Sequence, residues 1–148
     1  MASVLSDPAL HTFTGGTPST VDELRSRYAR MVAGPSDPGV SWCNWVLVLG
    51  EGGSRRLTGT VQVTIGPGRR GLLAAEIAWV VGTPWQGRGI ATEAARGLVR
   101  WLDARGVGVL IAHIHPDHAA SAAVAGAVGL APTDARQDGE TRWERSSR

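Results

Sequence analysis

The sequence predicts a single α+β domain built around one mixed β-sheet. The chain has 148 residues, of which 43% are hydrophobic, and this suits one domain with an ordinary core. Three strand patterns follow one another through short glycine-rich linkers, which is typical of antiparallel hairpins. The full order is helix, three strands, helix, strand, helix and two strands. This order differs from a strict βαβ repeat and therefore favours an α+β fold.

The first helix is predicted to begin near Ser19 or Thr20 and to end at Gly34-Pro35. Thr20 and Glu23 have the spacing of a capping box, in which each residue bonds the other's main-chain N–H. The apolar residues of this segment fall on one helical face, at Val21, Leu24, Tyr28, Met31 and Val32.

Three strands are predicted next, at residues 42–49, 57–65 and 73–81. The linkers between them, 50–56 and 66–71, are short and rich in glycine. The second strand alternates cleanly, because Val61, Val63 and Ile65 are interleaved with Thr60, Gln62 and Thr64. One row is therefore expected to face the core and the other to face away from it.

The second half of the chain begins with an amphipathic helix at 91–105, which Gly106 terminates. Its buried stripe is expected to consist of Ala91, Ala94, Ala95, Leu98, Val99 and Leu102. The remaining elements are, in order, an apolar strand at 107–115, a small helix at 119–128, and two strands at 131–136 and 141–145 joined by a turn at Asp138-Gly139.

Charge and hydropathy limit the possible partners. The chain carries 15 basic and 13 acidic residues, a net charge of +2, and the arginines are scattered, so we expect no nucleic-acid partner. The N-terminus lacks the pattern of a signal peptide, and no run of about 18 apolar residues exists. We therefore expect a soluble cytoplasmic protein without a membrane partner.

The loop at residues 86–91 is the most informative feature of the chain. Gly87 and Gly89 remove side chains from a turn that opens directly into a helix. Such a turn presents unpaired main-chain N–H groups at the positive end of the helix dipole, where phosphate oxygens bind well. The sequence therefore predicts a ligand that carries a diphosphate, although a plain strand-to-helix turn is the alternative.

Two other phosphate loops fit less well. A Rossmann fingerprint requires a third small residue, which falls at Thr92, and an acidic residue ending the next strand, where His113-x-His115 stands. A Walker loop is excluded because the sequence contains no Gly-Lys-Ser/Thr.

The pattern Gln-x-x-Gly-x-Ala at Gln86–Ala91 resembles that of the GNAT superfamily of acyl-CoA-dependent N-acetyltransferases. The resemblance looks closest to the branch of the ribosomal-protein alanine acetyltransferases and extends over roughly residues 19–145. The segments that carry it are residues 75–81, 84–94, 115–121 and 129–130.

The resemblance implies a mixed, mostly antiparallel sheet, flanked by helices, in which the two central parallel strands, 73–81 and 107–115, splay apart. The pantetheine arm of acetyl-CoA, the co-substrate, would lie in the splay and pair with the main chain of Trp79, Val80 and Val81. Its pyrophosphate would accept hydrogen bonds from the N–H groups of Gln86, Gly87, Arg88, Gly89, Ile90, Ala91 and Thr92.

The chain departs from the family pattern in three places. Family members usually have a strand and most of a helix before the segment that matches residues 1–18, so we expect an N-terminal edge strand to be missing or the start codon to be misassigned. His118 stands where the family usually has Asn. The family's frequent tyrosine acid has no counterpart, because the single tyrosine, Tyr28, lies on the first helix.

Glu76 is the candidate general base, because it is the sole charge in the apolar run 72–81 and family members often carry a catalytic Glu on this strand. The alternative is a Glu that points into water or pairs with an arginine. Ser121 matches a residue that often bonds CoA or the departing sulfur, and its alternative is a simple helix serine. His118 would donate to pantetheine or supply the missing acid, or be a surface turn residue.

These features together predict an N-acetyltransferase that moves an acetyl group from acetyl-CoA to a primary amine, on a small molecule or a protein N-terminus. A non-catalytic acyl-CoA-binding module is the alternative, and a homodimer is a possible assembly. We expect no metal at His113-x-His115-x-x-His118, because Asp117 is its only clear carboxylate partner. Trp42 and Trp45 are candidates to line the acceptor groove.

Overall fold

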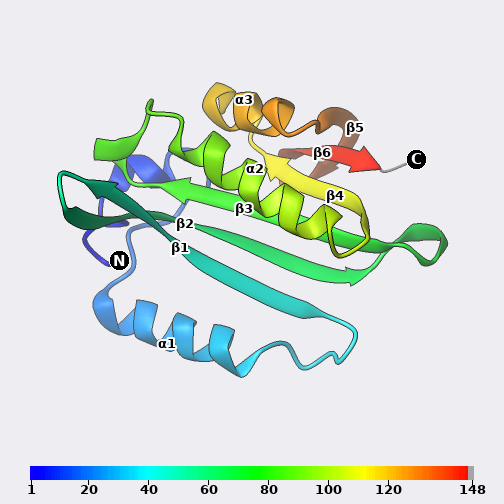
Figure 1. Ribbon diagram of the computed structural model, residues 1–148, viewed down its shortest axis with the longest axis horizontal. Coiled ribbons are helices and arrows are strands. Elements are labelled where there is room, and N and C mark those ends of the chain that lie inside the picture. Colours follow the sequence, from blue (N-terminus) through cyan, green and yellow to red (C-terminus); the bar gives the residue numbers. More distant parts are fainter. Residues whose placement is uncertain (147–148) are drawn as a thin grey trace.

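The computed structural model describes residues 1–146 as a six-stranded sheet with helices on both faces (Figure 1). The strand order is β1-β2-β3-β4-β6-β5. Every neighbouring pair is antiparallel except β3 and β4, which are parallel. The predicted mixed, mostly antiparallel sheet is therefore confirmed. The strands are β1 (Ser41–Glu51), β2 (Ser54–Pro67), β3 (Leu73–Val81), β4 (Val107–Ile114), β5 (Ala131–Gln137) and β6 (Glu140–Ser146).

Three α-helices accompany the sheet: α1 (Val21–Ala33), α2 (Ile90–Asp103) and α3 (Ala119–Ala127). The capping box predicted for α1 is present. The hydroxyl of Thr20 accepts from the Glu23 N–H at 3.2 Å, and the Glu23 carboxylate accepts from the Thr20 N–H at 2.7 Å. Within residues 1–146, no helix is long and apolar enough to cross a membrane.

The core lies between α2 and α3 and one face of the sheet. Four residues of the predicted α2 stripe are buried there, namely Ala95, Leu98, Val99 and Leu102, and the other two, Ala91 and Ala94, are partly buried against the core. Val61 and Val63 of β2 face this core, as their alternation predicts. The residues between them in β2 consequently project from the opposite face of the sheet, which α1 overlies.

The parallel strands separate halfway along their length. β3 pairs with β4 only from Leu73 to Glu76, opposite Val107 to Ile111. Beyond Glu76, β3 continues to Val81 beside β2 alone, while β4 continues beside β6. The edge of β3 that faces β4 is therefore free over its last residues, and this is the splay that the family resemblance implies.

The N-terminal segment packs against the end of β3. Residues 1–20 contain a 3-10 helix, η1 (Pro8–His11), and no strand. Val4 is buried, and a Cβ placed on Gly82 would come within 2.9 Å of its side chain. The edges of the described sheet are consequently β1 and β5.

Candidate active site

The glycine loop joins the end of β3 to the start of α2 through a short 3-10 helix, η3 (Thr83–Trp85). Gly87 and Gly89 have φ values of 71° and 76°, in the left-handed region where glycine is favoured. Gly89 is the N-cap of α2, and its carbonyl accepts the helix's first hydrogen bond, from Glu93, at 3.0 Å. The main-chain conformation therefore favours glycine at both positions.

The loop offers a run of free main-chain donors. The N–H groups of residues 87–92 find no acceptor within residues 1–146. They lie at the N-terminus of α2, where the helix dipole attracts negative charge by about 0.3–1 kcal/mol. The donors available for phosphate are Gly87, Arg88, Gly89, Ile90, Ala91 and Thr92.

Gln86 differs from its expected role. Its main-chain N–H already donates to the carbonyl of Thr83 at 3.2 Å, so it does not belong to the free donors. Its side-chain amide donates instead to the carbonyl of Val81 at 2.9 Å. Gln86 thus ties the glycine loop to the last residue of β3 and fixes one relative to the other.

The free edge of β3 offers a second set of main-chain groups. The N–H of Gly82 donates to Thr58 of β2 at 2.8 Å. Because main-chain groups alternate along an antiparallel strand, Val80 also bonds towards β2, and Trp79 and Val81 point the other way, into the splay. The family resemblance implies that the main chain of all three residues pairs with pantetheine, and the structure corrects this for Val80. The alternation selects Trp79 and Val81 for main-chain contact.

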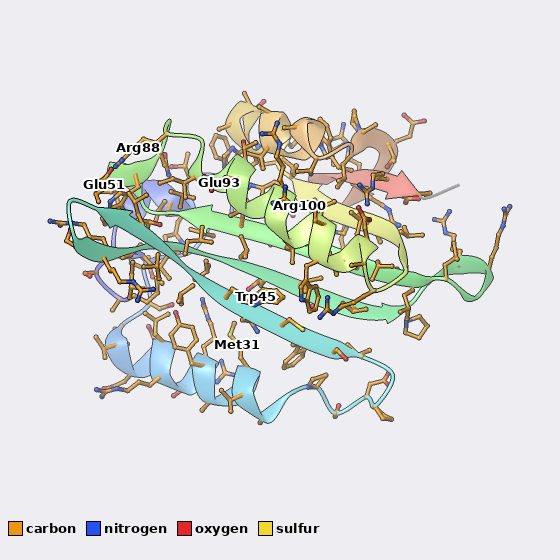
Figure 2. All side chains as sticks on the ribbon, viewed as in Figure 1. Met31, Trp45, Glu51, Arg88, Glu93 and Arg100 are labelled. Carbon is orange, nitrogen blue, oxygen red and sulfur yellow. The ribbon has the colours of Figure 1, made fainter. Side chains whose placement is uncertain are left out.

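Arg88 projects from the loop towards the hairpin that joins β1 and β2, where it forms an ion pair with Glu51 (Figure 2). Both side chains are about half exposed. The ion pair thereby ties the glycine loop to the end of β1. The sequence does not predict a role for Glu51, because Glu51 and Arg88 are 37 residues apart and local sequence patterns cannot identify such a pair.

Glu76 stands at the vertex of the splay, as the last residue of β3 that pairs with β4. Its carboxylate lies 3.0 Å from Nδ1 of His113 on β4. The Glu76 side chain is 53% exposed and that of His113 is 9% exposed. The largely buried histidine therefore holds the exposed carboxylate in position. Glu76 thus remains open to solvent, as the alternative of a side chain that points into water describes, and its partner is a histidine rather than an arginine.

His118 and Ser121 form a second pair, at the start of α3. His118 is the N-cap, and its Nδ1 accepts from the Ser121 N–H at 3.2 Å. Its Nε2 lies 3.3 Å from the Ser121 hydroxyl. Burial lowers the pKa of His118 below its ordinary value, and neighbouring His115 acts in the same direction. The imidazole is therefore neutral at pH 7, which argues for a positioning role rather than a cationic acid.

Phe13 covers this pair. Its ring centroid lies 4.4 Å from that of His118 and 5.3 Å from that of His115. The weakly patterned N-terminal segment thus contributes a side chain to the site, a contact that the sequence analysis missed because no periodicity marks it. Within the described chain, no group of three His, Cys, Asp or Glu side chains is arranged to hold a metal ion.

A groove of about 260 Å³ lies between α1 and the face of the sheet that carries Glu76. Trp42 lines it, as proposed for the acceptor side. Trp45 belongs to the opposite face, where it packs edge-on against Trp101 of α2 at a centroid distance of 5.1 Å. The groove residues are Arg27, Arg30, Met31, Trp42, Asn44, Gln62, Val63 and Thr64.

The arrangement combines a free strand edge, a donor loop at a helix N-terminus beyond one end of that edge, and a carboxylate at its other end, the vertex of the splay. Sequence comparison agrees with this geometry, because the family model of the acetyltransferase (GNAT) domain matches residues 1–131. The chain therefore belongs to the GNAT acetyltransferase family. Comparison with curated proteins gives no significant match.

Solved structures share the fold at low sequence identity. The GNAT-family acetyltransferase of Bacillus anthracis is 18% identical with a TM-score of 0.75, covering 99% of this chain and 86% of that one. An acetyltransferase of Agrobacterium tumefaciens is 23% identical with a TM-score of 0.71, covering 99% and 82%. The spermidine N-acetyltransferase of Vibrio cholerae, solved with CoA and spermine, is 13% identical with a TM-score of 0.73, covering 99% and 87%.

The depressed pKa of His118 predicts a pH-dependent stability. The unfolded chain takes up the proton near pH 6.5, before the folded chain does, so the free energy of unfolding should fall as the pH drops below about 6.5. His118→Asn keeps an N-cap and removes this titration. Urea denaturation from pH 7 to pH 5 should therefore show a steeper loss in the wild type. Equal slopes for the two proteins would contradict the prediction.

Proposed function

We propose that the protein is an N-acetyltransferase that transfers the acetyl group of acetyl-CoA to a primary amine by direct attack in a ternary complex. The observation that carries the proposal is the presence of two sets of free main-chain groups, one on the splayed edge of β3 and the other in the loop that follows it, at residues 87–92. An extended pantetheine arm can pair with the strand edge, and a pyrophosphate can accept hydrogen bonds from the loop. The CoA complex of the Vibrio cholerae enzyme, which shares the fold, supports this proposal.

The transfer needs a neutral amine and a polarised thioester. In the proposed reaction the amine nitrogen attacks the thioester carbon and forms the C–N bond. The electron pair of the C=O bond moves to oxygen, where N–H groups of the Trp79–Val81 strand stabilise the negative charge. Glu76, directly or through a water, takes the proton released by the amine.

The tetrahedral intermediate then collapses. The C–S bond breaks, the sulfur leaves with the bonding electrons, and the thiolate takes up a proton from solvent to give free CoA. In the proposed step, the Ser121 hydroxyl, whose oxygen lies 3.3 Å from Nε2 of His118, donates a hydrogen bond to the departing sulfur. The ordered loop and strand hold the thioester in place, and orientation alone can contribute about 7–11 kcal/mol to such a reaction.

The proposed function also includes an acceptor, a cellular compartment and an assembly state. The acceptor is a small-molecule amine or a protein N-terminus, the latter in keeping with the resemblance to the ribosomal-protein alanine acetyltransferases. The whole chain acts as one domain in the cytoplasm. We also propose that two copies of the chain form a homodimer, because β1 is an edge strand whose main-chain groups are open to pairing.

A non-catalytic acyl-CoA-binding module is the second candidate. It is favoured by one observation, that the only tyrosine, Tyr28, lies on α1 and leaves the leaving thiolate without the family's usual acid. A thiol-release assay across a panel of amines separates the two candidates, because a binding module shows affinity without turnover.

Gly89→Glu should abolish acetyl-CoA binding, because it places a carboxylate among the phosphate donors and strains a left-handed residue. Gly106→Glu is the matched control, since Gly106 also has a positive φ, 73°, and open space around its Cα but lies at the far end of α2. Isothermal titration calorimetry should show no binding for the first variant and wild-type affinity for the second. Wild-type affinity in Gly89→Glu would refute the loop assignment.

Glu76→Gln should lower kcat/KM roughly 100-fold at pH 7 and by a smaller factor at pH 9, where more of the amine is already neutral. The amide retains a polar partner for His113, so the fold should survive. The check is a pH series of thiol release for both proteins. A rate ratio that stays constant across the series would remove Glu76 from the role of base.

A further inference from the structure

The groove between α1 and the sheet is next to the vertex of the splay. It lies on the sheet face that carries Glu76, because Trp42 of β1 is opposite Thr64 of β2, and Thr64 is opposite Glu76 of β3. Residues directly opposite each other project from the same face with Cβ atoms about 5 Å apart. An amine at Glu76 therefore has the groove one to two strand spacings away, about 5–10 Å.

Two arginines give the groove its charge. Arg27 and Arg30 are three residues apart on α1 and so share a helical face, and no acidic residue lines the groove. Arg30 forms no side-chain hydrogen bond or ion pair within residues 1–146. Among the described residues, Arg27 donates only to the Ser19 hydroxyl, at 3.4 Å, and Glu23 lies nearby along the helix. At least one guanidinium is thus free to bind an anion.

Apolar side chains complete the groove. Trp42 is 42% exposed, and it lines the groove together with Met31 of α1. Figure 2 shows Met31 between α1 and β1. A short hydrocarbon chain between an amine and an anionic group therefore has an apolar wall to contact.

We infer that the preferred acceptor is a primary amine that carries a carboxylate or phosphate several bonds from the nitrogen. Glu76 receives the amine, Met31 and Trp42 contact the spacer, and Arg30 with Arg27 binds the anion. The span disfavours simple α-amino acids, whose two groups are about 3 Å apart, and the arginines repel polyamines. The inference rests on the proposed function, because it assigns the acceptor of that same site.

Three acceptors of equal length test this inference: 6-aminohexanoate, hexylamine and 1,6-diaminohexane. They differ only in the group at the far end, which is anionic, absent or cationic. The wild type should show the highest kcat/KM for 6-aminohexanoate and the lowest for the diamine, by about tenfold or more between the two. An aminoalkyl phosphate of the same length distinguishes a phosphate acceptor from a carboxylate acceptor.

Arg30→Gln should reduce the ratio of kcat/KM for 6-aminohexanoate over hexylamine roughly five- to tenfold, and Arg30→Glu should invert the order of 6-aminohexanoate and the diamine. Arg25→Gln is the control, because Arg25 lies on the same helix but pairs with Asp22 at 3.2 Å. It should leave the ratio unchanged.

Hexylamine turnover separates the two proposals. Turnover of hexylamine without a preference for 6-aminohexanoate overturns the inference and leaves the proposed function standing. Absence of turnover for every amine contradicts the proposed function. In that case calorimetric binding of 6-aminohexanoate, lost in Arg30→Gln and kept in Arg25→Gln, still supports the anion site, and absence of binding to the wild type overturns it.

Discussion

The structure depends on one constraint, the end of the hydrogen bonding between the parallel strands β3 and β4 at Glu76. Up to that residue the two strands hold the sheet together, and beyond it β3 has a free edge within the sheet. Free main-chain groups in a protein interior demand a partner, because an unpaired buried N–H is costly. An extended cofactor that completes the ladder satisfies this demand without requiring particular side chains.

The sheet separates two tasks. On one face α2 packs over the core, and its N-terminus carries the loop whose N–H groups point outward. On the other face α1 leaves the arginine-bearing groove. The splay connects the faces, and Glu76 with its partner His113 stands at the connection, 3.0 Å from atom to atom. In the proposed reaction, an acyl group from one side meets an amine from the other.

Local patterns predicted most of the fold. The capping box of Thr20, the bounds of β3 and the buried stripe of α2 follow from residues close in sequence, and all are confirmed. The contacts that sequence reasoning missed join distant residues: Arg88 with Glu51, Glu76 with His113, and Phe13 with His118. Periodicity has no information about such pairs. The dual role of Gln86 was missed because the loop pattern does not distinguish a main-chain donor from a side-chain anchor.

Amide hydrogen exchange along β3, measured by NMR with and without acetyl-CoA, tests the central claim most directly. Trp79 and Val81 point into the splay, whereas Val80 already bonds towards β2 and serves as an internal reference. Binding should slow exchange at Trp79 and Val81 far more than at Val80. Unchanged exchange at Trp79 and Val81 in the presence of saturating acetyl-CoA would contradict the account.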